Sequence, residues 1–455
     1  MIANLKRYGP FALAALALLA LLDPALAQET ATEAVEVVAA AEAVPTIDTG
    51  DTAWMLTSTA LVLLMTIPGV ALFYGGMARK KNVLDVSMQS FAICCIATLI
   101  WFVCGYSLAF TPNADESMQA FIGGLDRLFL TGMSVDSINP LGPTIPESVY
   151  MMFQMTFAII TPALIAGAFA ERMKFSAMLI FMALWSLIVY VPIAHWVWGG
   201  GFLGGDGVLD YAGGTVVHIN AGIAGLVCCI LVGKRRGYGT EIMAPHNVLL
   251  SLIGASLLWV GWFGFNAGSA VGAGMRAGMA MTVTQVATAA AGLTWMFAEW
   301  VLRGKPSMLG LISGAVGGLV AITPASGFVN PMGALWIGIA SGLACYWGAV
   351  WLKHKLGYDD SLDVFGVHGI GGIVGAILTG VFADPAIGGE AAAGMLYGNP
   401  GQLWVQIQGI LWTAGWCAIV SIVILLLIKM VIGLRVDAET EVAGLDLNLH
   451  GESIQ

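Results

Sequence analysis

Eleven long apolar segments, separated by short polar stretches, make up most of this chain. Most approach the roughly 20 residues that a helix needs to cross the hydrocarbon core of a bilayer. The pattern therefore predicts an all-α polytopic membrane protein with eleven transmembrane helices in a domain over residues 51–429. The segments lie approximately at 54–77, 88–110, 149–170, 176–198, 215–232, 247–270, 277–302, 308–323, 332–352, 364–383 and 403–429.

Composition supports a membrane protein and excludes several other classes. Hydrophobic residues make up 58% and charged residues only 10% of the chain, against roughly 25% charged in an average soluble domain. The net charge of -10 argues against nucleic-acid binding, so the lipid bilayer is the expected surrounding. We find neither a nucleophile–base set nor a metal-ligand cluster, and the cysteines form no C-x-x-C pair. We therefore expect no enzyme activity, no metal and no cofactor.

Basic residues alternate between loops in a way that predicts orientation. If the mature N-terminus lies outside, the outer loops hold only Arg127 and Arg276. The positive-inside rule then predicts an outer N-terminus and a cytoplasmic C-terminus. The inner loops and the tail hold Arg79, Lys80, Lys81, Arg172, Lys174, Lys234, Arg235, Arg236, Arg303, Lys305, Lys353, Lys355, Lys429 and Arg435.

The first 50 residues differ from the rest. Residues 1–27 are typical of a cleaved signal peptide, with Lys6 and Arg7 before a short apolar core and a small-x-small site at Ala25-Leu26-Ala27. The alternative interpretation is a first transmembrane helix. Residues 28–50 are acidic and rich in Ala, Val and Thr, which predicts a disordered leader.

One short motif occurs twice, and each copy places a histidine inside an apolar segment. Val217–Gly225 and Val367–Gly375 both read V-H-x-x-x-G-I-x-G, and each histidine follows an aspartate by eight residues. Five spans in about 51–232 and five in 247–383 form two halves, and an odd number of spans forces the second half to insert upside down. The chain therefore predicts a 5+5 inverted repeat, with a site near the midplane, and helix 403–429 as an extra brace.

His218 and His368 are the main ionisable residues within the spans, where polar groups are costly and suggest function. Two alternatives stay open: structural histidines satisfied by neighbours, and a pair of haem ligands. Aromatic residues gather at 153–157, 196–198 and 262–265. Rings near span ends indicate either an interfacial belt or a pore mouth that attracts a cation.

Several stretches resemble those of bacterial members of the ammonium transporter family (Amt/Mep, related to Rh proteins). The resemblance runs from about residue 51 to the C-terminus and leaves out the leader. It implies a channel-like transporter of ammonium or ammonia, with methylammonium as an analogue. The matching stretches are Thr66–Gly76, Ala170–Arg172, Ala194–Gly201, Asp210–Asn220, Gly261–Ser269 and Asp363–Gly369.

The resemblance also implies roles for aromatic residues at the outer mouth. Phe157, Trp198 and Ser269 resemble the external recruitment site, where two rings and a hydroxyl bind NH4+ after it sheds water. Phe153 and Phe265 resemble the stacked rings that block the pore below that site.

Deeper in the pore, the resemblance assigns His218 and His368 to the twin histidines that line a narrow apolar conduit. Asp210 resembles a buried acid that orients the recruitment site without binding ligand. A bare ammonium ion pays several kcal/mol to enter an apolar pore, whereas a neutral imidazole offers one donor and one acceptor nitrogen. We therefore expect deprotonation at the mouth and passage of ammonia along the histidines.

The tail, residues 430–455, resembles the family's cytoplasmic tail, which implies a homotrimer coupled through it. With the loop 233–239, it suggests a docking face for an inhibitory PII-type signal protein. The alternative is a solvated charged tail beside a loop that only sets topology. A second functional class is an ammonium sensor with the transporter fold, whose mark would be a large appended domain. Aquaporin and potassium-channel motifs are lacking.

Overall fold

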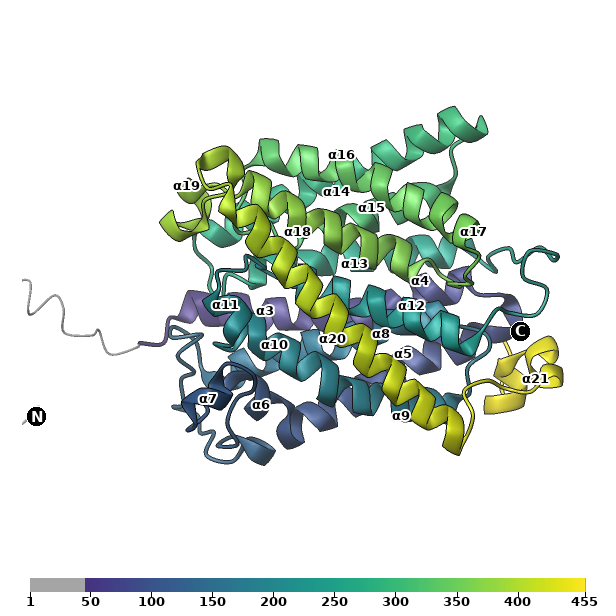
Figure 1. Ribbon diagram of the computed structural model, residues 1–455, viewed down its shortest axis with the longest axis horizontal. Coiled ribbons are helices and arrows are strands. Elements are labelled where there is room, and N and C mark those ends of the chain that lie inside the picture. The colour runs from purple at the N-terminus through teal and green to yellow at the C-terminus, as the bar shows by residue number, and fades with distance from the viewer. Residues whose placement is uncertain (1–45, 455) are drawn as a thin grey trace, which may run out of the picture. The chain divides into compact units, whose positions relative to one another are not determined.

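The computed structural model describes residues 46–454, in which helices pack side by side and no β-strand forms (Figure 1). The expected signal peptide and nearly all of the expected leader lie outside the described residues. Residues 46–48 are extended, and the first described helix begins at Thr49 after its N-cap, Asp48, whose side chain accepts from the backbone N–H of Asp51.

The first half of the chain supplies five spans, close to the predicted positions. Several of them combine α-helix with a turn of π- or 3-10 helix. They are Thr49–Met77 (α3 Thr49–Leu64, η1 Met65–Val70, α4 Ala71–Met77), Lys80–Phe110 (η2 Lys80–Asn82, α5 Val83–Ile100, η3 Trp101–Gly105, α6 Tyr106–Phe110), Glu147–Phe169 (α8), Phe175–Gly205 (α9 Phe175–Trp185, η5 Ser186–Tyr190, α10 Val191–Trp198, α11 Phe202–Gly205) and Gly214–Val232 (η6 Gly214–Ile219, α12 Asn220–Val232).

The second half supplies five more spans and the extra helix. Nine helical segments of the described chain are long and apolar enough to cross a membrane; α14 and the short α15 complete the eleven expected. The six helices of the second half are Val248–Gly268 (α13), Met275–Arg303 (α14), Met308–Ile322 (α15), Pro331–Leu356 (α16 Pro331–Tyr346, η7 Trp347–Leu352, α17 Lys353–Leu356), Phe365–Phe382 (η8 Phe365–Gly369, α18 Ile370–Phe382) and Gly401–Val431 (α20). Shorter elements are α7 Glu116–Gln119, η4 Leu128–Leu130, α19 Pro385–Gly388, η9 Glu390–Ala392, η10 Met395–Tyr397, α21 Ala438–Ala443 and η11 Asp446–His450.

Local sequence explains where the spans begin and end. The side chain of Asn247 accepts from the backbone N–H groups of Leu249 and Leu250 and so caps α13. Asn330 caps α16 in the same way, and Pro331 follows it at the first helical position. After α14, Gly304 adopts φ 79°, a left-handed conformation that glycine tolerates and that ends the helix.

The inverted repeat brings the two histidine-bearing helices together at the centre. A Cβ on Gly222 would lie 2.3 Å from the Cα of Gly369, and a Cβ on Gly372 would lie 3.1 Å from the backbone nitrogen of Ile219. In each motif, the glycine four residues after the histidine thus faces the residue that follows the other histidine. This reciprocal contact lets the two backbones approach closely, because neither glycine adds a side chain at the crossing.

The extra helix and the tail complete the fold. α20, at 31 residues about 46 Å long, crosses obliquely over the other helices in Figure 1 and packs on α9, α12 and α18. It therefore acts as the expected brace. The tail after it lies against the loops at one end of the bundle, since Val436 donates its N–H to Arg172 O and Arg435 pairs with Glu441 at 2.7 Å.

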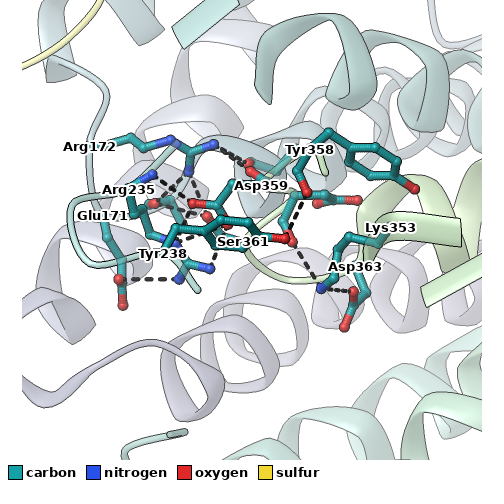
Figure 2. Close-up of polar contacts among 12 residues, drawn as sticks. Glu171, Arg172, Arg235, Tyr238, Lys353, Tyr358, Asp359, Ser361 and Asp363 are labelled. Carbon is teal, nitrogen blue, oxygen red and sulfur yellow. Dashed lines mark hydrogen bonds and ion pairs between the residues drawn. The ribbon is translucent and has the colours of Figure 1, made fainter. Parts of the chain in front are cut away.

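The loops at that end are tied by a buried charge network, which Figure 2 shows. Arg235 contacts Asp359 at 2.8 Å and Glu171 at 3.3 Å, while Glu171 also pairs with Arg79 at 2.7 Å. Arg172 donates to the backbone oxygen of Asp359 at 2.6 Å. Burial alone would raise the pKa of Asp359, but hydrogen bonds from Arg235 hold it below its usual range. The network joins four loops around what we call the charged end of the bundle.

Candidate functional site

Two aspartates lie just before the helices that carry the histidines and accept hydrogen bonds from backbone N–H groups at the start of each. The carboxylate of Asp210 accepts from the backbone N–H groups of Gly213 at 2.8 Å, Gly214 at 2.6 Å and Thr215 at 2.8 Å. Asp360 accepts from Phe365 N–H at 2.7 Å. The eight-residue spacing between aspartate and histidine is thus the length of a helix cap plus about one turn, which carries each histidine into the protein.

The histidines meet where these two helices cross. The Nδ1 atoms of His218 and His368 are 3.3 Å apart, and the rings lie nearly parallel, 5.3 Å between centroids. Since a neutral imidazole has one donor and one acceptor nitrogen, one Nδ1 donates and the other accepts. Among the described residues, His218 Nε2 is buried without a hydrogen-bond partner. A buried polar atom left unpaired costs about 1–3 kcal/mol, so a ligand that pairs with it is favoured at this position.

Aromatic rings continue from His218 towards the other end of the bundle. The ring of His218 stacks on that of Phe265, with centroids 6.0 Å apart. Phe265 in turn lies 4.4 Å from Phe157, and Phe157 lies 5.0 Å from Phe153 and 5.6 Å from Trp198. The order from the histidine is therefore Phe265, Phe157, then Phe153 and Trp198.

This order corrects one expectation. The family resemblance implied that Phe153 stacks on Phe265, but within the described residues Phe265 packs on Phe157, and Phe153 pairs only with Phe157. The physical reason is height along α8. Phe153 and Phe157 share one face of that helix, but they lie one turn apart, about 6 Å along the axis, and Phe157 is level with Phe265.

A hollow of about 270 Å³ opens beyond these rings, and Phe153, Phe157, Trp198 and Ser269 contribute to its wall. The indole N–H of Trp198 donates to the backbone oxygen of Asp210 at 2.8 Å, so the capped loop also orients this ring. The hydroxyl of Ser269 donates to Phe265 O at 2.8 Å, which leaves its lone pairs available to accept. Two ring faces and a hydroxyl oxygen suit a small cation that donates hydrogen bonds.

Comparison with known proteins matches this architecture. Residues 53–454 match the Ammonium Transporter Family. The chain belongs to the ammonium transporter family. An ammonium transporter of Aquifex aeolicus is 52% identical over 406 residues, 89% of this chain and 93% of the relative. One of Bacillus subtilis is 49% identical over 403 residues, 89% of this chain and 98% of the relative.

Solved structures of the family agree with the fold. Mep2 of Saccharomyces cerevisiae is 35% identical with a TM-score of 0.80, over 87% of this chain and 89% of that one. A structure titled Sensor Amt Protein is 28% identical, also with a TM-score of 0.80, over 88% of this chain and 98% of that one. The relatives of Aquifex aeolicus and Bacillus subtilis are named ammonium transporters, and the chain is a multi-pass membrane protein.

In this family member, one site residue escaped the sequence analysis. Trp262 stacks on the face of His218, with centroids 5.3 Å apart and an angle of 19°. Its indole N–H donates to the hydroxyl of Thr323 at 2.9 Å, which fixes the ring. Trp262 stood in a recognised aromatic cluster, but nothing in the sequence distinguished a ring on the histidine from a ring facing lipid.

A third buried histidine offers a contrast. Both ring nitrogens of His195 lie against backbone oxygens, since Nδ1 is 2.9 Å from Ala109 O and Nε2 is 2.6 Å from Gln119 O. The neutral ring donates to one of them. His195 is therefore held by the surrounding backbone, whereas His218 Nε2 has no hydrogen-bond partner among the described residues.

A second hollow, of about 620 Å³, lies at the charged end. The loop 233–239 forms part of its wall with Lys234, Arg235 and Tyr238, and residues just before η8 form another part with Ser361 and Asp363. This hollow therefore lies where the helix that carries His368 begins, at the end of the bundle opposite the aromatic mouth.

Proposed function

We propose that this protein transports ammonium by recruiting NH4+ at the aromatic mouth, removing one proton, and conducting ammonia past the twin histidines. The observation that carries the proposal is the Nδ1–Nδ1 contact of 3.3 Å between His218 and His368, with His218 Nε2 free of protein partners. The stacked rings of Phe265 and Trp262 on the same histidine give this site apolar walls.

Within the mouth, the geometry supports a division of roles that differs from the expected one. Phe153, Trp198 and Ser269 form the recruitment site, and Phe157 packs against Phe265, with the ring planes tilted by 46°, as the block beneath it. Phe157 still touches Trp198, so it borders both. Asp210 holds the loop that orients Trp198 and does not bind the ion, because both of its carboxylate oxygens already accept hydrogen bonds.

Selectivity follows from the chemistry of the two species. A cation over aromatic faces gains about 2 kcal/mol or more when it is desolvated, which supports binding at the mouth. Entry of the charge into the apolar conduit costs several kcal/mol, whereas ammonia is neutral and can both donate to and accept from imidazole. Potassium has no proton to give up, so it stops at the block.

The test replaces the pair with His218→Asn and His368→Asn in proteoliposomes that are given an ammonium pulse. Losing hydrogen-bond partners in the conduit is expected to slow ammonium flux by roughly tenfold or more, since about 1.4 kcal/mol is a factor of ten. The control is His195→Asn, a buried histidine outside the conduit. Unchanged ammonium current and methylammonium uptake in the double variant would refute the proposal.

A sensor with the transporter fold is the second candidate, favoured by the likeness to the Sensor Amt Protein. Growth of a transporter-deficient strain on limiting ammonium separates the two functions. We expect the chain to restore growth, which a sensor that does not conduct would fail to do.

The homotrimer is part of the proposal, and α14 supports it. This helix presents Gly278, Thr282, Gln285 and Ala289 on one outward face, and exposed polar groups are unfavourable against lipid. Contact with a second copy would cover them. Masses measured in nanodiscs test the stoichiometry.

We also propose that a PII-type protein inhibits transport by inserting a loop into the hollow at the charged end. Support comes from the size of that hollow and from its basic and tyrosine side chains, including Lys234 and Tyr238. The same end carries most of the basic loops, which supports an orientation with this end on the cytoplasmic side of a bacterial inner membrane. A cleaved signal peptide before the domain is part of the same proposal. The test is a pull-down of a PII-type protein with this chain at both extremes of the ATP-to-ADP ratio and of the 2-oxoglutarate concentration. Failure to bind under all of these conditions would refute the interaction.

A further inference from the structure

The tail docks on the first turn of α5 through a buried acidic residue. The carboxylate of Asp446 accepts from Asp85 N–H at 2.8 Å and Leu84 N–H at 3.1 Å, so a residue from the end of the chain caps a helix near its beginning. Beside it, Asn82 Oδ1 accepts from Leu445 N–H at 2.8 Å. These bonds exist only while the tail is docked.

A histidine closes this contact. His450 Nε2 lies 2.9 Å from Asp85 Oδ1, and the other oxygen of Asp85 accepts from Gln89 Nε2 at 2.9 Å. The edge of Phe175, at the start of α9, packs on the His450 ring with centroids 5.1 Å apart. Asp85 is completely buried and Asp446 is 2% exposed, so solvent screens this pair of acids poorly.

Three carboxylates act on His450, and Lys80 and Lys81 line a small hollow beside one of them, Asp446. Asp85 faces it from α5, Asp446 and Glu452 face it from the tail, and Phe175 from α9 adds no charge. The hydrogen bond to Asp85 raises the pKa of His450, and partial burial opposes this only in part. If the ring loses its proton, the buried carboxylate of Asp85 loses the cation that hydrogen-bonds to it while it stays close to Asp446, an arrangement that is strongly unfavourable.

We propose that His450 and Asp85 form a pH-sensitive latch, which holds the tail in place when the compartment on its side is neutral or acidic and releases it when that compartment becomes alkaline. The sign follows from linkage. A group that binds its proton more tightly when docked stabilises docking fully below its free pKa, about 6.5 for histidine, and this stabilisation is lost as the pH rises through the docked-state pKa.

Release of the tail would reach the pore exit. Glu441 of the tail accepts from Arg236 N–H at 2.7 Å. The neighbouring Arg235 pairs with Asp359, which lies shortly before the helix that carries His368. The docked tail thus supports the loop that lines the inner hollow. Undocking removes that support, and we expect slower conduction.

This inference rests on the proposed function where it concerns feedback. Each ammonia that crosses as a neutral molecule takes up one proton on the tail side and forms ammonium there. Uptake therefore consumes protons next to the latch and raises the local pH. The latch would then open and slow further uptake.

Hydrogen–deuterium exchange of residues 444–452 tests the latch directly in nanodiscs, with exposure times scaled to the intrinsic amide rate at each pH. In the wild type we expect these amides to exchange several-fold faster at about pH 8.5 than at about pH 6.5. His450→Lys keeps a cation beside Asp85 and should stay protected at both values. His450→Gln keeps a neutral donor and should show weaker protection that does not vary with pH.

The matched control is His246→Gln, a histidine in the loop before α13 at the same end, which should retain the wild-type pH response. A wild-type tail whose protection is the same at both pH values would overturn the latch, as would a His450→Gln variant that keeps the full pH response. Ammonium currents on the same samples separate the two claims. Absence of current in the wild type contradicts the proposed function, whereas current with a tail that ignores pH contradicts only the latch.

Discussion

Asp210 and Asp360 occupy equivalent positions before the two histidine-bearing helices, yet replacement by asparagine should change the stability of the fold very differently at the two positions. At Asp210 both oxygens are in use: Oδ1 accepts from Gly213 and Gly214, and Oδ2 accepts from the N–H and hydroxyl of Thr215. In Asp210→Asn the amide nitrogen must face backbone N–H donors whichever way the side chain turns. At Asp360 only Oδ2 has a partner, Phe365 N–H, and Oδ1 has none.

The magnitudes follow from counting donors that lose their acceptor. A buried N–H left unsatisfied costs about 1–3 kcal/mol, and two lose their acceptor in Asp210→Asn. Loss of the negative charge at the helix N-terminus adds about 0.3–1 kcal/mol. We therefore expect Asp210→Asn to lower the free energy of unfolding by about 2–7 kcal/mol. In Asp360→Asn the remaining oxygen can still accept from Phe365, so the expected change is within about 1 kcal/mol or stabilising.

Denaturant titration of purified protein, followed by tryptophan fluorescence, measures both variants against the wild type. The same samples report on the mouth, because the loop of Asp210 orients Trp198; Asp210→Asn should therefore also weaken ammonium recruitment. Equal destabilisation by the two substitutions would refute the reasoning, since it would mean that the free oxygen of Asp360 has a partner that the geometry does not reveal.

Three further outcomes are expected. Burial raises the pKa of Asp360 to about 6. An acid whose pKa is raised in the folded state lowers the stability of the fold when it is charged, so the wild type should gain stability as the pH falls from about 7 to about 5. Unfolding titrations of Asp360→Asn should lack that gain. Gly222→Ala would place a Cβ 2.3 Å from the facing backbone and should cost about 1–3 kcal/mol or more and slow ammonium uptake, whereas Gly415→Ala, with open space around it, should behave as wild type in both assays. Asp359→Asn leaves the buried guanidinium of Arg235 without its main partner and should destabilise by about 3–5 kcal/mol; thermal stability close to wild type would contradict the role given to the charge network.

Nine of the spans in the described chain could be predicted from sequence because their length and apolarity suffice for a helix to cross a bilayer. Their ends were harder to locate. The second span begins at Lys80 but was expected only from residue 88. The expectation started too late because the first turns of this helix carry polar residues such as Asn82 and Asp85. These side chains are buried beneath the tail, and no local hydropathy pattern reveals a cover that comes from 360 residues further along the chain.

The ring order at the mouth shows a different limit. Residues 153 and 157 share a helix face, and the period of 3.6 residues says only that both rings point the same way. Which of them meets Phe265 depends on the relative height of α8 and α13, and packing between distant segments sets that height. The sequence could therefore indicate the set of aromatic residues but not their order.

The doubled motif can be explained by packing as much as by chemistry. Two imidazole nitrogens can lie 3.3 Å apart only if the helices that carry them cross almost backbone to backbone. Gly222 and Gly372 make that crossing possible, each opposite the residue after the other histidine. A histidine with the same chemistry but without its glycine would be held away from its partner, and the shared hydrogen bond would break. Pairs of inverted histidines should therefore form a common site only where each has a small residue four positions later, and the side-chain volume at residues 222 and 372 should control the distance between the rings.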